Sequence, residues 1–150
     1  MSSDKSVLIA SDHAGVELKA QLIKRLSAWE WVDLGPLDSS RVDYPDYAEK
    51  LTERIASGQA RRGILICGSG IGMSIAANKV KGIRAALVEN PIAARLSREH
   101  NDSNVLCLGS RFVAPEYGSE IAEEWLKAEF SQDARHQGRL KKITAIEGKN

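Results

Sequence analysis

Short runs rich in β-branched and apolar residues alternate with helical stretches along this chain. Five runs are candidate strands: Val7–Ala10, Trp31–Leu34, Gly63–Cys67, Arg84–Val88 and Asn104–Leu108. Apolar residues between them recur at the spacing of a helix face, and Pro45, Pro91 and Pro115 stand where helices would begin. Strands that alternate with helices favour a parallel sheet covered on both faces. The sequence therefore predicts an α/β fold, a Rossmann-like three-layer sandwich on a five-stranded parallel sheet.

The composition narrows the class of protein. A chain of 150 residues with 43% hydrophobic and 27% charged residues suits one globular domain, so we expect a single domain over residues 1–150. The net charge of +1 gives no general attraction to nucleic acid or to an anionic membrane. Two cysteines, no signal-peptide pattern and no apolar run of membrane length indicate a cytoplasmic protein without structural disulfides.

The third candidate strand ends at Cys67 in a glycine-rich turn, Gly68-Ser69-Gly70-Ile71-Gly72, which opens a helix. Such a turn lets the backbone approach a ligand closely, and the first N–H groups of the helix favour an anion. A thiol beside it is suited to act as base or nucleophile. No Lys-Ser or Lys-Thr pair follows, which disfavours a Walker-type loop, and the first strand lacks a dinucleotide fingerprint. A role in packing alone stays open for this turn.

Two other strand exits carry polar residues. The first strand leads into Asp12 and His13, and the fifth leads into Arg111. Ligands of open α/β sheets collect at the carboxyl ends of the strands. If the first, third and fifth strands are neighbours, a carboxylate, an imidazole, a guanidinium and the thiol of Cys67 converge there.

Further candidate groups lie later in the chain. His100 and Asn101 end the helix that leads to the fifth strand, and Arg135 and Arg139 are spaced to lie side by side on a helix, as a phosphate would require. A surface histidine and a solvated helix face are the alternatives. The histidines and cysteines lack the close spacing of a zinc site, so we expect no metal.

Eight segments, in order along the chain, carry a broader resemblance: Ser11–Gly15, Asp43–Pro45, Cys67–Gly72, Ala76–Lys79, Gly82–Ala85, Ser97–Asp102, Gly109–Arg111 and Arg135–Arg139. In these segments the chain resembles the type B ribose-5-phosphate isomerases, in the family shared with galactose-6-phosphate and allose-6-phosphate isomerases. The resemblance implies a metal-independent, cofactor-free interconversion of ribose 5-phosphate and ribulose 5-phosphate through an enediol. It covers nearly the whole chain.

The resemblance also implies a role for each candidate residue. Cys67 would be the base that moves a proton between C2 and C1, Ser69 would stabilise the enediolate, and His100 would open the sugar ring. The substrate would be contacted by Asp12, His13, Tyr44, Gly68, Gly70, Ile71, Gly72, Asn101, Arg111, Arg135, His136 and Arg139. Of these, His13, Arg111, Arg135, His136 and Arg139 would hold the phosphate.

The resemblance further implies a homodimer, or a dimer of dimers, with active sites at the subunit interface. Arg135 and Arg139 would then reach the neighbouring subunit's site. Two alternatives remain at this point: a six-carbon sugar phosphate as substrate, as for the galactose or allose enzymes, and a non-catalytic protein that binds a sugar phosphate on the same fold.

Overall fold

The sheet is parallel throughout and has the strand order β2-β1-β3-β5-β4. A computed structural model describes residues 4–149. The strands are β1 (Ser6–Ser11), β2 (Glu30–Asp33), β3 (Gly63–Cys67), β4 (Ala85–Leu87) and β5 (Val105–Gly109). The predicted α/β architecture is confirmed, and β1, β3 and β5 are neighbours, which brings the three polar exits to one edge of the sheet.

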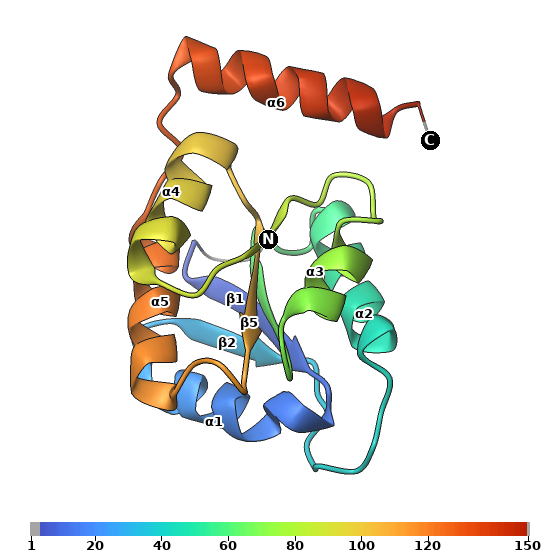
Figure 1. Ribbon diagram of the computed structural model, residues 1–150, viewed down its shortest axis with the longest axis vertical. Helices are drawn as coiled ribbons and strands as arrows, with labels where there is room; N and C mark the ends of the chain where they lie inside the picture. Colours follow the sequence, from blue (N-terminus) through green and yellow to red (C-terminus); the bar gives the residue numbers. More distant parts are fainter. Residues whose placement is uncertain (1–3, 150) are drawn as a thin grey trace.

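Helices cover both faces of the sheet (Figure 1). They are a short 3₁₀ turn η1 (His13–Gly15), α1 (Val16–Arg25), α2 (Tyr44–Ala56), α3 (Ile71–Ala77), α4 (Pro91–Asn101), α5 (Pro115–Lys127) and α6 (Ala134–Glu147). Helices α1, α4 and α5 pack on one face, and α2 and α3 pack on the other. These layers make the three-layer sandwich that the sequence predicts.

Each face of the sheet has its own core because successive side chains of a strand point to opposite faces. In β1, Val7 and Ile9 enter the core under α1, α4 and α5, while Leu8 and Ala10 enter the core under α2 and α3. All five residues of β3 are buried. Burial on both faces explains why the central strands β1, β3 and β5 are apolar runs without polar alternation, whereas the edge strand β2 is largely exposed.

Local signals set several element boundaries. The side chain of Asn90 accepts a hydrogen bond from the N–H of Ala93 at 2.8 Å and so caps the N-terminus of α4. Strand β4 is shorter than the predicted Arg84–Val88 at both ends. At its start, the backbone N–H of Arg84 donates to the side chain of Asn104 at 2.8 Å.

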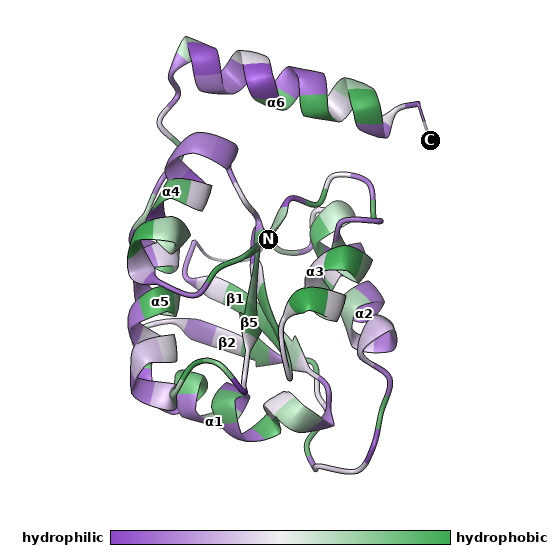
Figure 2. Ribbon diagram, viewed as in Figure 1, coloured by the Kyte–Doolittle hydropathy of each residue, from purple (hydrophilic) through white to green (hydrophobic). Residues whose placement is uncertain are grey.

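Helix α6 lies across one end of the molecule beside α4, away from both faces of the sheet (Figure 1). Apolar residues gather toward its C-terminal end (Figure 2), where Ile143 and Ile146 are 46% and 61% exposed. A cavity of about 810 Å³ separates these two side chains from the body of the molecule. Within residues 4–149, no helix has the length and apolar character that crossing a bilayer requires.

Candidate active site

The exits of β3 and β5 are joined by backbone hydrogen bonds. The N–H of Ser110 donates to the carbonyl of Cys67 at 2.9 Å, and that of Arg111 donates to the carbonyl of Gly68 at 3.0 Å. A Cβ on Gly109 would lie 2.6 Å from the backbone carbonyl of Ser69, so only glycine permits this approach. The glycine-rich turn is therefore built against β5 as well as β3.

Cys67 stands at the start of this turn with its sulfur turned toward the backbone. Its Sγ accepts a hydrogen bond from the N–H of Gly70 at 3.1 Å, and the side chain is 4% exposed. Gly70 has a φ of 76°, in the left-handed region that glycine adopts without strain. The hydroxyl oxygen of Ser69 accepts from the N–H of Ile71 at 3.2 Å. This bond leaves the hydroxyl proton of Ser69 available to a ligand.

Asp12 and His13 follow β1 at the same edge. The N–H of Asp12 donates to the carbonyl of Ile66 in β3 at 3.0 Å, and its carboxylate accepts from the N–H of Ala14 at 2.9 Å. The Nδ1 atom of His13 lies 3.2 Å from the carbonyl oxygen and 3.3 Å from the nitrogen of Val42. His13 thereby contacts the loop that leads into α2.

Tyr44 and Arg111 both lie close to glycines of the turn. A Cβ on Gly72 would come within 2.5 Å of the Tyr44 ring, so this ring packs directly on the first turn of α3. A Cβ on Gly68 would lie 3.2 Å from Nε of Arg111. One chain thus brings a thiol, a hydroxyl, a carboxylate, an imidazole, a phenol and a guanidinium to the edge of the sheet that carries the glycine-rich turn.

His100 and Asn101 lie at the other end of the strands, at the edge of the sheet formed by the amino ends of β3 and β5. The N–H of Gly63, at the amino end of β3, donates to the carbonyl of Asn104, which closely follows α4. Cys67 ends the same strand, four residues further, which corresponds to about 13 Å at the rise of a strand. A single chain therefore does not bring the predicted ring-opening histidine to the predicted base.

The remaining predicted residues accompany His100. The rings of His100 and His136 lie 4.3 Å apart between centroids, and Nδ1 of His136 is 2.6 Å from the hydroxyl of Ser131. Arg135 donates to both carboxylate oxygens of Asp133 at 3.2 and 3.3 Å. These hydrogen bonds raise the pKa of Arg135 and lower the pKa of Asp133 to about 2.

Helix α6 also carries Arg139, whose side chain is exposed. The resemblance assigned only Arg135 and Arg139 to a neighbouring site, yet the fold groups His100, Asn101 and His136 with them. The candidate site is therefore divided into two halves at opposite edges of the sheet.

The second cysteine lies within a strand of the sheet and not at the glycine-rich turn. Cys107 in β5 is fully buried, and this burial raises the pKa of its thiol, with a further contribution from Cys67. It packs as a small apolar residue in the core under α2 and α3. Among residues 4–149, no group of three or more His, Cys, Asp or Glu side chains is placed to share a metal ion.

Sequence reasoning did not single out Ile75 or assign a role to Gly109. Gly109 is required because of its contact with Ser69, and the only signal in the sequence is a glycine at the end of an apolar strand. Ile71 and Ile75 are 51% and 58% exposed on α3. Their spacing of four residues places them on one helix face and could have indicated a contact surface.

The fold and the turn define the class of this protein: an α/β protein whose parallel sheet presents a thiol and a glycine-rich turn at its carboxyl edge. Residues 7–143 match the family described as Ribose/Galactose Isomerase. The chain therefore belongs to the ribose/galactose isomerase family.

Individual relatives are similar over almost their full length. Ribose-5-phosphate isomerase B of Escherichia coli is 46% identical, over 95% of this chain and 97% of that protein. The structure of ribose-5-phosphate isomerase B from Clostridium thermocellum has a TM-score of 0.92 at 48% identity and covers 96% of this chain and 98% of its own. The enzyme from Mycoplasma genitalium, with bound ribulose-5-phosphate, has a TM-score of 0.90 at 42% identity, with 97% of each chain covered.

Proposed function

We propose that this chain is a type B ribose-5-phosphate isomerase, a single isomerase domain that interconverts ribose 5-phosphate and ribulose 5-phosphate without metal or cofactor. The observation that carries the proposal is the thiol of Cys67 held in the glycine-rich turn by the N–H of Gly70 at 3.1 Å. Relatives named for this activity at 42–48% identity support the choice of a pentose phosphate.

The chemistry needs a base beside a donor for a developing oxyanion. Cys67, as a thiolate, takes the proton from C2 of the open aldose, and the electron pair moves onto the C1 oxygen to give an enediolate. The same sulfur returns that proton to C1, and the hydroxyl proton of O2 ends on O1, which leaves the carbonyl at C2. Ser69, whose oxygen already accepts from Ile71, donates its free proton to the enediolate. A well-placed donor of this kind is worth about 3–4 kcal/mol.

The anionic end of the substrate needs cations and N–H donors. His13 and Arg111 stand at the carboxyl edge with the turn, and Arg135 and Arg139 lie on α6. A phosphate held at a distance from the reacting carbons orients the short sugar toward the base, so its binding energy assists the chemical step.

A second copy of the chain completes the site in this proposal. Helix α3 begins beside Cys67 and exposes Ile71 and Ile75. Figure 2 shows apolar residues on α3 and again at the C-terminal end of α6, and isoleucine side chains in both regions are 46–61% exposed in one chain. Burying both against a second copy removes about 25 cal/mol of unfavourable hydration for each Å² of apolar surface.

The cavity beside α6 is suited to receive α3 of a second copy. It has a volume of about 810 Å³, and its lining includes Ile143 and Ile146 on one side and Asn101 on the other. When α3 of one copy enters this cavity of the other, Cys67 of the first comes to His100 and Asn101 of the second. A two-fold dimer repeats the exchange and produces two complete sites.

The test is an assay of the purified, EDTA-treated protein with ribose 5-phosphate, allose 6-phosphate and galactose 6-phosphate in parallel, following ketose formation. We expect turnover of ribose 5-phosphate without added metal. A preference for a six-carbon substrate would transfer the assignment to that branch of the family. Binding without turnover would favour a non-catalytic sugar-phosphate-binding protein.

A further inference from the structure

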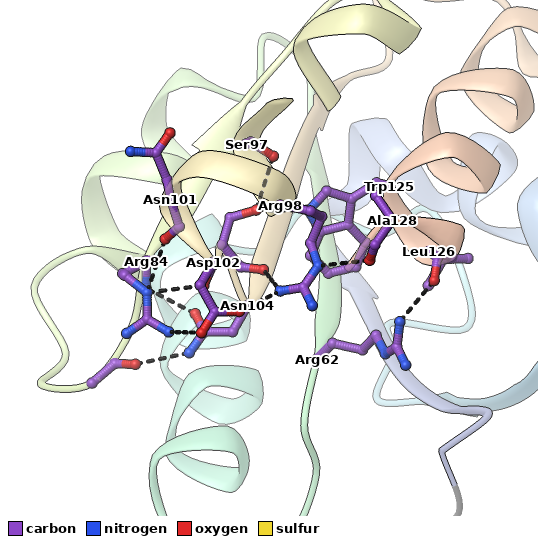
Figure 3. Close-up of polar contacts among 12 residues, drawn as sticks. Arg62, Arg84, Ser97, Arg98, Asn101, Asp102, Asn104, Trp125, Leu126 and Ala128 are labelled. Atoms are coloured by element: carbon purple, nitrogen blue, oxygen red, sulfur yellow. Dashed lines mark hydrogen bonds and ion pairs between the residues drawn. The ribbon is translucent and has the colours of Figure 1, made fainter. Parts of the chain in front are cut away.

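The C-terminal end of α4, which carries His100 and Asn101, is held by a guanidinium from outside the helix (Figure 3). Arg84 lies just before β4, and its Nε donates to the carbonyl oxygens of Asn101 at 3.2 Å and of Asp102 at 2.9 Å. Carbonyls at the end of a helix have no partner within it. Arg84 therefore caps α4 and sets the position of its last turn.

Asp102 shares its two carboxylate oxygens between two arginines. Oδ2 accepts from Nη2 of Arg84 at 3.3 Å, and Oδ1 accepts from Nη1 of Arg98 at 3.0 Å. The residue has a φ of 45°, a left-handed conformation that a side chain other than glycine adopts only when its surroundings hold it there. We call Arg84, Asp102 and Arg98 the α4 clamp.

The α4 clamp is tied to the sheet and to α5. The N–H of Arg84 donates to the Asn104 side chain at 2.8 Å, and the Asn104 N–H donates back to the carbonyl of Arg84 at 3.0 Å. Nη1 of Arg98 donates to the Ser103 carbonyl at 2.5 Å, and its guanidinium lies over the Trp125 ring at 5.8 Å. The indole N–H of Trp125 donates to the Ser103 hydroxyl at 2.8 Å. The clamp is thus fixed from two directions.

The clamp leaves the candidate functional groups free. Its hydrogen bonds use the backbone of Asn101, and Figure 3 shows the side-chain amide pointing away from Arg84. The side chains of His100 and Asn101 are exposed, while the His100 ring rests against His136 at 4.3 Å. The structure thus holds the backbone rigidly and presents the imidazole and the amide outward.

We propose that Arg84, acting through Asp102, is a positioning residue that sets where His100 and Asn101 stand when they meet the substrate beside Cys67 of a second copy. The inference rests on the proposed function, because it assumes that these two groups contact the sugar. A displacement of about 1 Å at a reacting group can cost roughly a hundredfold in rate. Loss of the clamp should therefore lower kcat without removing any residue that touches the substrate.

The first test compares Arg84→Met with a control variant on α4, Arg95→Met. Arg95 is exposed and lies 4.0 Å from Glu99, away from the clamp. We expect Arg84→Met to lower kcat for ribose 5-phosphate roughly tenfold or more with a smaller change in KM, and Arg95→Met to leave both unchanged. Arg84→Lys should recover only part of the lost kcat. A single ammonium group cannot reach the carbonyl oxygens of Asn101 and Asp102 and the Asp102 carboxylate at the same time. An unchanged kcat in folded Arg84→Met would overturn the proposal.

Subunit mixing separates positioning from general damage to the fold. In a mixture of Arg84→Met with Cys67→Ala, each hybrid dimer has one site with both defects and one with neither. Random pairing should then restore about a quarter of the wild-type sites. A mixture of Arg84→Met with His100→Asn should restore none, because both defects lie in the same half-site.

A reference mixture of Cys67→Ala with His100→Asn tests the shared site itself. Activity could recover in this reference mixture and yet not recover in the mixture of Arg84→Met with Cys67→Ala. That result would overturn the positioning role, because the loss of Arg84 would then also damage the half-site that contains Cys67. A wild-type chain without any turnover would instead overturn the proposed function, and the inference with it. Should Arg84→Met not fold, Asp102→Gly replaces it, since glycine accepts a φ of 45° and only the carboxylate is lost.

Discussion

The sulfur of Cys67 lies 3.1 Å from the backbone nitrogen of Gly70, which donates a hydrogen bond to it. This donor would stabilise negative charge on the sulfur, and it belongs to the same turn as Ser69, whose hydroxyl oxygen accepts from the N–H of Ile71 at 3.2 Å. The proposed base and the proposed oxyanion donors therefore belong to one turn of the backbone.

Replacing Cys67 should abolish isomerisation while the protein stays folded. In Cys67→Ala the base is lost, and general-base catalysis typically contributes 10²- to 10⁴-fold, so we expect a loss of at least roughly that size in kcat. Ketose formation measures activity, and circular dichroism checks the fold. The matched control is Cys107→Ala, which removes the other buried thiol and should retain most activity. Turnover near the wild-type rate in Cys67→Ala would rule out the thiolate mechanism.

His100→Asn should reduce activity selectively. Ring opening needs a group that can both take and give a proton near neutral pH, and an amide cannot do so. We expect a large loss of kcat with the cyclic sugar phosphate and a smaller loss with a substrate that has no ring to open. Steady-state kinetics on the two substrates measure the difference. Equal losses on both would argue against a ring-opening role.

Arg139→Met should raise KM more than it lowers kcat. Arg139 is exposed on α6 in one chain, and we propose that it reaches the phosphate in the second copy's site. A lost contact to a group remote from the reacting carbons is felt mainly in binding. We expect KM for ribose 5-phosphate to rise at least roughly tenfold, because a charge-assisted hydrogen bond is worth about 1.5–3 kcal/mol. The exposed Lys141→Met on the same helix is the control.

The buried thiol of Cys107 should make the protein less stable in alkali. Its pKa is raised in the folded state, so the unfolded chain loses this proton first as the pH rises. The stabilising effect is complete below the unfolded pKa of about 8.5 and declines above it, by at most about 1.4 kcal/mol per pH unit. Urea unfolding between pH 7 and pH 10 should show a smaller decline for Cys107→Val than for the wild type. Parallel declines in the two proteins would contradict this account.

Lys19→Met should destabilise the protein without touching the proposed chemistry. The Lys19 side chain is 2% exposed, and its Nζ donates to Asp33 and to the carbonyl of Pro36, both at 2.6 Å. Asp33 is 30% exposed and accepts a hydrogen bond from the N–H of Gly35 at 2.9 Å, which the variant retains. We therefore expect the free energy of unfolding to fall by no more than about 3 kcal/mol. Urea unfolding measures this loss. Lys24→Met, on the exposed face of α1, should change stability by less than about 0.5 kcal/mol.

Much of the fold follows from local signals in the sequence. The bounds of all five strands were predicted to within one residue. The central strands β1, β3 and β5 are apolar runs that are buried on both faces, whereas the edge strand β2 is largely exposed. Pro45 and Pro91 stand in the first turns of α2 and α4, as expected from a residue that needs no N–H partner there. The resemblance in eight segments also named the candidate residues.

The tertiary structure decided how those residues are grouped. Periodicity shows that His100 ends a helix, but only the parallel sheet shows that this helix returns to the edge opposite Cys67. The same limit applies to Arg84, whose position beside Asn101 and Asp102 depends on β4 and β5 being neighbours.

The sequence by itself determined the strands, the helices and the chemical groups, because these depend on residues close together in the chain. The division of the site into a Cys67 half and a His100 half arises from contacts between residues far apart in the chain. Local periodicity carries no information on such contacts, and only the folded sheet with its helices sets them.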